Sequence, residues 1–106
     1  MTSQENELRA QLQNPDEEVA VKAAVDLCRG ILHPQNRWED SEMVLLGAVG
    51  LQSSSSGQII HLLLGQTYVK MNEIPRAIRF FDRALESSIP EIKTEAESAL
   101  EELRQK

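Results

Sequence analysis

Side chains that could perform catalysis or bind metals are few in this sequence. His33 and His61 are its two histidines, and neither has a cysteine or carboxylate nearby at the spacing of metal ligands. The sequence has no Gly-rich phosphate loop, no nucleophile elbow and no pair of carboxylates flanked by apolar residues. We therefore expect a protein that is not an enzyme and that uses no metal or cofactor.

Cys28 is the single cysteine and falls among apolar residues of a predicted helix. A small buried hydrophobic side chain is a better interpretation of it than a redox thiol. One cysteine cannot form an internal disulfide, so a reducing, cytoplasmic location is expected. His61 could make a pH-sensitive contact with a partner, but a packed histidine is the favoured interpretation.

Arginines recur along one side of a predicted helix, at Arg76, Arg79 and Arg83. They could form a site for an acidic ligand. However, Asp82 and Glu86 each follow an arginine by three residues. Exposed ion pairs along the helix are therefore the favoured interpretation.

Length and charge restrict the classes of partner. The chain has 106 residues, 41% of them hydrophobic, and a net charge of −6. This length suits one domain, and the negative field repels phosphate backbones, so nucleic acid is not expected as a partner. The longest apolar run, Met43 to Leu51, is far shorter than the ~20 residues of a membrane span, so no membrane insertion is expected.

The elements that would position these side chains are predicted to be helices, so the expected fold class is all-α. Residues 1–13 form a polar segment in which Leu8 and Leu12 lie one helical turn apart. Asn14, followed by Pro15, is expected to cap a helix that runs to about residue 32.

A second helix is expected to be capped by Asp40 or Ser41 and to run to about Gln52. Its apolar run, Met43 to Leu51, predicts burial on more than one face. Gly47 and Gly50 within this run are expected to mark close helix contacts.

The most regular stretch covers residues 58–89 and reads QIIHLLLGQTYVKMNEIPRAIRFFDRALESSI. Asn72 can adopt the left-handed conformation that ends a helix, and Pro75 suits the first turn of the next, so two antiparallel helices are predicted. Small residues would let these helices approach, and large ones would fill the remaining space. The residues in these packing roles are Leu64, Gly65, Tyr68, Ala77, Phe81 and Ala84.

The spacing of these packing residues resembles the tetratricopeptide repeat, whose pattern is a Leu-Gly pair followed by a Tyr, an Ala, a Phe and a closing Pro. Two positions depart from it, because His61 stands where Trp is preferred and the closing Pro is displaced by one residue, to Pro90. The resemblance implies one domain, residues 1–106, built as a right-handed stack of antiparallel helix pairs. After the polar segment it places a degenerate first pair at 15–53, a second repeat at 56–89 and a capping helix at 90–106.

The first pair matches the second clearly only at its end, where Leu51-Gln52-Ser53-Ser54 aligns with Leu85-Glu86-Ser87-Ser88. Matching Gly30 to Gly65 requires one extra residue in the loop and puts Asp26 and Arg29 at buried positions. The register of the first pair therefore stays open.

In tetratricopeptide proteins the first helix of each pair lines a concave groove that holds a peptide. By this resemblance the groove side carries Ile59, Leu62, Gln66, Val69 and Lys70. The Lys and Asn residues with which chaperone-binding members hold a C-terminal carboxylate are not matched, because Leu62 and Gln66 stand there. The resemblance therefore implies a protein or peptide ligand with an apolar surface.

The helix at 58–70 carries more apolar residues than one amphipathic stripe needs, so something must cover both of its sides. An adaptor or assembly factor would hold an apolar partner there, and would stay folded when Leu62 is changed to Glu. A structural subunit would instead use its apolar faces to form a homodimer or a larger fixed complex. Alternatively, the N-terminal segment could fill the groove with Leu8 and Leu12.

Overall fold

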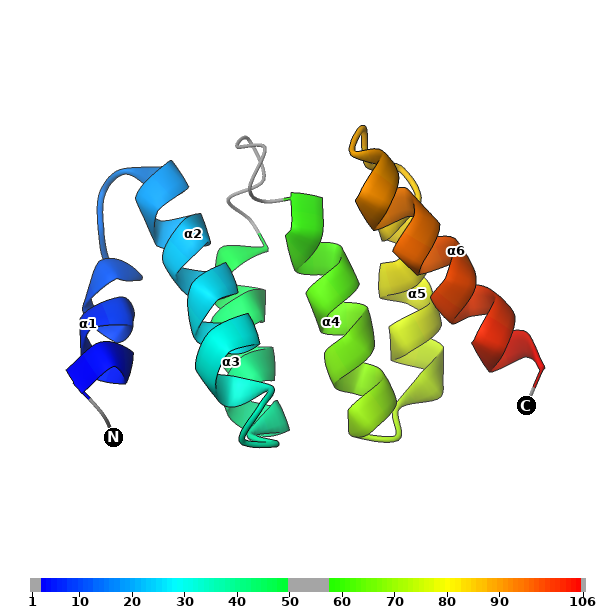
Figure 1. The fold of residues 1–106 in the computed structure, drawn as a ribbon, viewed down its shortest axis with the longest axis horizontal. Coiled ribbons are helices and arrows are strands. Elements are labelled where there is room, and N and C mark those ends of the chain that lie inside the picture. The colour runs from blue at the N-terminus through cyan, green and yellow to red at the C-terminus, as the bar shows by residue number, and fades with distance from the viewer. Residues whose placement is uncertain (1–2, 50–57, 106) are drawn as a thin grey trace.

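The computed structural model describes residues 3–49 and 58–105, and this part of the chain is helical with no strand (Figure 1). The expected all-α class is confirmed. A π-helical turn, η1, continues α2 without a break. The elements are α1 (Ser3–Gln11), α2 (Glu17–Leu27), η1 (Cys28–Leu32), α3 (Trp38–Ala48), α4 (Gln58–Lys70), α5 (Ile74–Ala84) and α6 (Pro90–Arg104).

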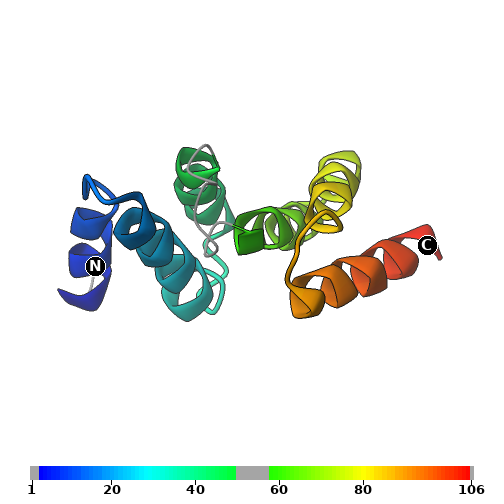
Figure 2. The ribbon, with the colours of Figure 1, turned by 90° about the horizontal axis from the view of Figure 1, so that it is seen from above.

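The helices form two rows with α4 between them. In Figure 2, α2 and α6 lie on one side, α3 and α5 lie on the other, and α1 lies beyond α2 at the end of the molecule. The helices α2 and α3 run antiparallel, as do α4 and α5 (Figure 1). Because it lies in the middle, α4 packs against α3, α5 and α6. No helix within the described ranges is long and apolar enough to cross a bilayer.

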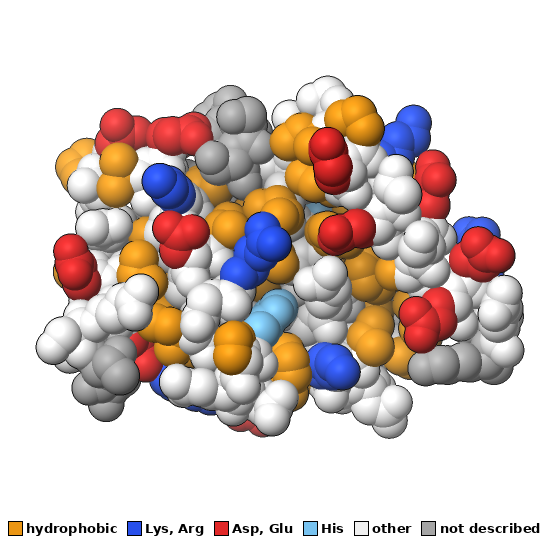
Figure 3. Space-filling view, in the orientation of Figure 1, with side chains coloured by type: hydrophobic (Ala, Val, Ile, Leu, Met, Phe, Trp, Pro, Cys, Tyr) orange, Lys and Arg blue, Asp and Glu red, His pale blue; other side chains and the backbone are white. Residues whose placement is uncertain are grey.

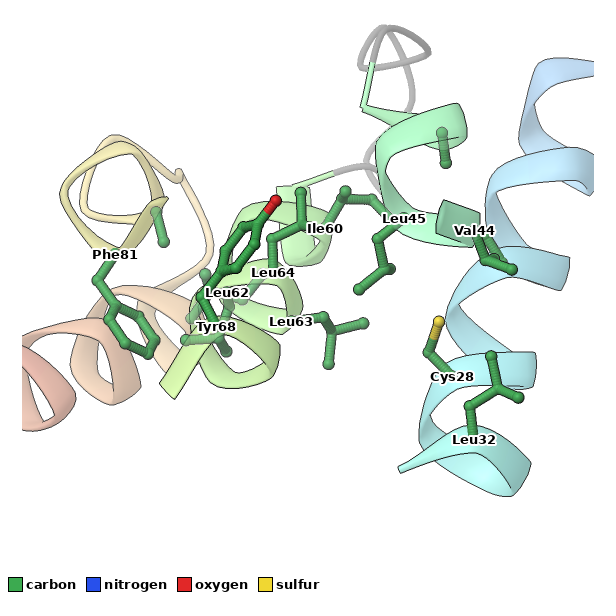
Figure 4. Close-up of a cluster of buried hydrophobic side chains, with 14 of the residues drawn as sticks. Cys28, Leu32, Val44, Leu45, Ile60, Leu62, Leu63, Leu64, Tyr68 and Phe81 are labelled. Carbon is green, nitrogen blue, oxygen red and sulfur yellow. The ribbon is translucent and has the colours of Figure 1, made fainter. Parts of the chain in front are cut away.

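The apolar core passes through α4 and joins both halves of the protein. Figure 4 shows it running from Phe81 of α5, through the leucines of α4, to Leu45 of α3 and Cys28 of η1. Leu62, on one side of α4, is 2% exposed, and Leu64, on another, is fully buried. The prediction that α4 is covered around most of its circumference is confirmed.

Gly65 marks a close approach of α4 and α5. A Cβ at this position would lie 2.6 Å from Cε1 of Phe81, closer than real Cβ atoms come to another atom. Ala77 and Ala84 of α5 are also buried, so the predicted packing of small against large residues is confirmed. The similar prediction for Gly47 is wrong, because a Cβ there would meet nothing within 4 Å, and Gly50 lies outside the described residues.

The turns within the two helix pairs have the same backbone geometry. Asn36 and Asn72 are the non-glycine residues of the described ranges with positive φ, at 58° and 61°. In each turn the next amide donates to a carbonyl five residues back, Arg37 N to Leu32 O and Glu73 N to Tyr68 O, both at 2.9 Å. This is the Schellman end of a helix. Counted from Asn36 and Asn72, Leu45 corresponds in residue number to Phe81, and Ala48 corresponds to Ala84. The alignment proposed for residues 51–54 lies outside the described residues.

The π-turn explains why the first helix pair was hard to align. His33 N donates to Cys28 O at 2.8 Å, so this turn holds one more residue than an α-helical turn. The extra residue therefore lies inside the helix, not in the loop. The match of Gly30 to Gly65 is wrong, because Gly30 is exposed and a Cβ there would meet nothing within 4 Å. Asp26 and Arg29 are also exposed rather than buried.

Two of the predicted helix caps are also wrong. Asp16, not Asn14, caps α2 by accepting from Glu18 N at 3.0 Å, while Asn14 Oδ1 accepts from Asp16 N at 2.8 Å. The helix α3 starts at Trp38, earlier than predicted, and has no side-chain cap. Asp40 binds Arg37 instead, so its carboxylate is used in an ion pair.

The N-terminal helix does not fill the groove. It packs against α2 at the end of the molecule, away from α4 (Figure 2). Its Leu8 and Leu12 are partly buried against the core, and its Glu5 binds Arg37 in the turn before α3. The helix α1 therefore covers the outer side of α2.

Candidate functional site

A cavity of about 200 Å³ opens between η1, α4 and α6. It lies on the face where α4 is set back between α2 and α6 (Figure 2). Figure 3 shows hydrophobic side chains in the middle of this face together with basic and histidine side chains, and acidic side chains on both sides of them. The lining residues are Arg29 of η1, Ile59, Leu62, Leu63 and Gln66 of α4, and Glu91, Ile92 and Glu95 of α6.

The sequence-predicted groove residues are brought together only in part. Ile59, Leu62 and Gln66 line the cavity, because spacings of three and four residues place them on one side of α4. Val69 and Lys70, near the end of α4, do not line it. Val69 is half-buried against the core, and Lys70 is exposed.

Leu62 has a different role from the one expected. It is only 2% exposed, so it forms the floor of the groove and also belongs to the core. A glutamate at this position would place a carboxylate in the core. The burial of Leu62 therefore argues against the expectation that Leu62→Glu removes a partner and leaves the fold intact, and the exposed Gln66 is the better site for a test.

The residues that sequence reasoning missed lie on the other two walls. Arg29 projects from η1, and Glu91, Ile92 and Glu95 come from the first turns of α6. Ile92 is buried together with Ala96 and Leu100 of the same helix. Nothing in the sequence indicated that the two glutamates and Arg29 border one cavity, since this depends on how the helices are placed.

A hydrogen-bonded link holds η1 against α4. Thr67 Oγ1 donates to Leu63 O at 2.8 Å, so it must accept from His33 Nε2 at 3.0 Å. Burial and the nearby Arg29 guanidinium lower the pKa of His33. The neutral form of His33 is therefore the one that the folded protein favours.

Cys28 is fully buried, which confirms its interpretation as a packing residue. Its Sγ lies 3.9 Å from Ser41 O, and burial raises the pKa of the thiol to about 11. The thiol therefore stays protonated near neutral pH. Within the described part of the chain, no group of three or more His, Cys, Asp or Glu residues could hold a metal ion.

Aromatic rings and arginines form a second surface between α4 and α5. The Phe80 ring stacks between His61, at 6.0 Å, and Tyr68, at 5.6 Å, so His61 is packed as predicted. Arg83 lies over Phe80 at 5.4 Å, and Arg76 lies over Tyr68 at 5.7 Å. Arg76 forms ion pairs with Glu42 and Glu73. The predicted ion pairs of Arg79 with Asp82 and of Arg83 with Glu86 are not formed among the described residues.

The outer surface of α3 is more exposed than predicted. Met43 is 73% exposed and Leu46 is 43% exposed. Met43 borders a cavity of about 400 Å³ between α1, α2 and α3, which Leu12 and Gln13 also line. The prediction that this helix is buried on more than one face is therefore wrong for these residues, because no described helix covers that side.

Comparisons of the chain with family models, with curated proteins and with solved structures find no match. The ligand of the groove must therefore be inferred from its own side chains.

Proposed function

We propose that this chain is a non-catalytic protein-binding adaptor of tetratricopeptide type, which holds an apolar segment of a partner in the groove between η1, α4 and α6. The observation that carries the proposal is the cavity itself. Its floor is apolar, at Leu62, Leu63 and Ile92, and it opens beside the half-buried Ile59 and the exposed Gln66.

The size of the cavity supports a peptide anchor over a small molecule. Small-molecule sites usually enclose roughly 300–1,000 Å³. The groove encloses about 200 Å³, which suits the insertion of one large apolar side chain. In peptide recognition of this kind, a few buried anchors supply most of the affinity.

The position of α4 also supports the proposal. By the tetratricopeptide resemblance, the first helix of a pair faces the ligand, and α4 is the first helix of the second pair. The net charge of −6 is consistent with a protein partner rather than nucleic acid. A cytoplasmic location is part of the proposal, because it would keep the single thiol reduced.

The test uses peptides selected from a random displayed library against the wild-type protein, with affinity measured by fluorescence anisotropy. In Gln66→Tyr a ring fills the mouth of the groove at an exposed position. Its matched control is Gln13→Tyr, an exposed position that lines the other apolar cavity.

If the groove is the site, Gln66→Tyr weakens binding by about tenfold or more, as expected for blocking an anchor pocket, while Gln13→Tyr binds as the wild type does. Full affinity of Gln66→Tyr would exclude the groove. Loss of binding only in Gln13→Tyr would move the site to the cavity beside α1.

A second candidate function is that of a structural subunit that forms a homodimer or joins a fixed complex. The exposure of Met43 and Leu46 favours it, because exposed neighbouring apolar side chains are typical of assembly surfaces. Light scattering over a range of concentrations tests it. A dimer in the wild type that Met43→Gln with Leu46→Gln dissociates would support this function, and a wild-type monomer at all concentrations would exclude a homodimer.

A further inference from the structure

The two walls of the groove carry charges of opposite sign. Arg29 lies on the η1 wall, and Glu91 and Glu95 lie on the α6 wall of the same cavity. All three side chains are exposed, and none of them forms an ion pair with another described residue. The groove therefore presents unpaired opposite charges on either side of an apolar floor.

The arrangement can be followed on the surface. In Figure 3 acidic side chains lie on the half of the face that α6 occupies and also on the half that α2 occupies, with hydrophobic side chains between the two halves. The two walls of the cavity contribute the carboxylates of Glu91 and Glu95 and the guanidinium of Arg29.

Such an arrangement affects specificity more than affinity. Charges at the rim of an apolar site steer association and orient the ligand, while the apolar contacts supply most of the binding energy. A like charge of the ligand beside either wall would be repelled. The opposite charges of the two walls therefore restrict which apolar segments bind and in which direction a bound segment runs.

We propose that the groove selects a net-basic amphipathic segment of a partner protein, which inserts an apolar side chain over Leu62, places lysine or arginine against Glu91 and Glu95, and turns its acidic edge toward Arg29. This inference rests on the proposed function of the groove. A second copy of this chain is a poorer occupant, because the chain carries a net charge of −6.

The experiment compares two sets of short synthetic peptides that share a central pair of leucines. One set carries lysines on one edge, and the other carries glutamates at the same positions. Affinities are measured by fluorescence anisotropy at low and high ionic strength. The proteins are the wild type, Glu91→Lys with Glu95→Lys, the blocked variant Gln66→Tyr, and a control with Glu97→Lys and Glu101→Lys.

The control pair has the same spacing on the same helix, and both of its residues are exposed and lie outside the cavity lining. It therefore changes the net charge of the protein equally without changing the groove walls. Circular dichroism of each variant confirms that the helices are intact before binding is compared.

The expected result is that the wild type prefers the lysine peptides by about fivefold, because two exposed rim pairs each contribute up to about fivefold at low salt. High salt should reduce this preference. The Glu91→Lys, Glu95→Lys protein should reverse it, the control should retain it, and Gln66→Tyr should bind neither set.

Other outcomes separate this inference from the proposed function. If the wild type binds both peptide sets equally and Gln66→Tyr binds neither, the groove is the binding site but it does not select by charge. Binding that survives in Gln66→Tyr, or no binding of either set to the wild type, would count against both. A change of oligomeric state in Glu91→Lys with Glu95→Lys would identify a second copy as the occupant and overturn the inference.

Discussion

Glu5 of α1 and Arg37 of the turn before α3 form a bidentate ion pair, with Oε1 2.7 Å from Nη1 and Oε2 2.9 Å from Nη2. Arg9 Nε donates to the same carboxylate at 3.0 Å. The Glu5 side chain is 2% exposed. This pair fastens a largely polar helix to the end of the molecule, where the apolar contacts of Leu8 and Leu12 are only partial.

Acidification should release α1. Hydrogen bonds from Arg37 and then Arg9 lower the pKa of Glu5 from 4.5 to about 2, against the effect of burial. Because the pKa of Glu5 is lower in the folded protein than in the unfolded chain, Glu5 contributes its full stabilisation above about pH 4.5. This stabilisation is lost as the pH falls toward 2. Glu5→Gln should lower the melting temperature at neutral pH. It should also remove the decrease in melting temperature that protonation of Glu5 causes between about pH 4.5 and pH 2 in the wild type.

The measurement is thermal unfolding followed by circular dichroism from acid to neutral pH, with amide hydrogen exchange in α1. Glu7→Gln, exposed on the same helix, is the control. Equal melting curves for the two variants would show that the pair does not hold α1.

Substitution of two glycines should have opposite effects. Gly65→Ala forces a methyl group against the Phe81 ring, which costs about 1–3 kcal/mol of overpacking and exceeds the ~1 kcal/mol gained in helix propensity. Gly47→Ala meets no atom within 4 Å and should stabilise the protein by up to about 1 kcal/mol. Urea unfolding measures both, and a stabilised Gly65→Ala would contradict the close approach of α4 and α5.

The link between His33 and Thr67 predicts a pH dependence near neutrality. Burial and Arg29 lower the pKa of His33 from its ordinary value of 6.5. As the pH falls below 6.5, His33 takes up a proton more readily in the unfolded chain than in the folded protein. The free energy of unfolding therefore decreases as the pH falls, and this loss is absent well above pH 6.5. His61 contributes in the same direction, mainly through burial.

Thr67→Val removes the acceptor of His33 at a fully buried site and should cost about 1–2 kcal/mol, whereas Thr67→Ser keeps the hydroxyl. An NMR titration of the two histidines measures their pKa values directly. A His33 pKa above 6.5 would be inconsistent with the buried neutral ring.

Leu62 and Gln66 should respond differently to a negative charge. Leu62→Glu places a carboxylate where the side chain is 2% exposed, and its cost of about 4 kcal/mol or more approaches the whole stability of a small domain. Gln66→Glu changes an exposed residue and should alter stability by less than about 0.5 kcal/mol. Urea unfolding compares them, and a folded Leu62→Glu protein would show that Leu62 belongs to an open surface.

Several features of the fold followed from local sequence. The helical spacing of apolar residues predicted the helices, Asn72 and Pro75 located the turn between α4 and α5, and Gly65 identified a close approach. These signals are local, since each depends on residues within a few helical turns. Cap positions were less predictable, because Asn14 and Asp40 each had another partner available.

What the sequence by itself determined is an all-helical chain in which α4 is apolar on most of its sides and carries Ile59 and Gln66 toward a groove. The tertiary structure decided which side chains share that groove and which are covered. It buried Leu62, left Met43 exposed, and set Arg29 opposite Glu91, although nothing in their spacing relates them. The reason is physical: helix periodicity fixes the face on which a residue lies, but only the packing of one helix against another determines what that face meets.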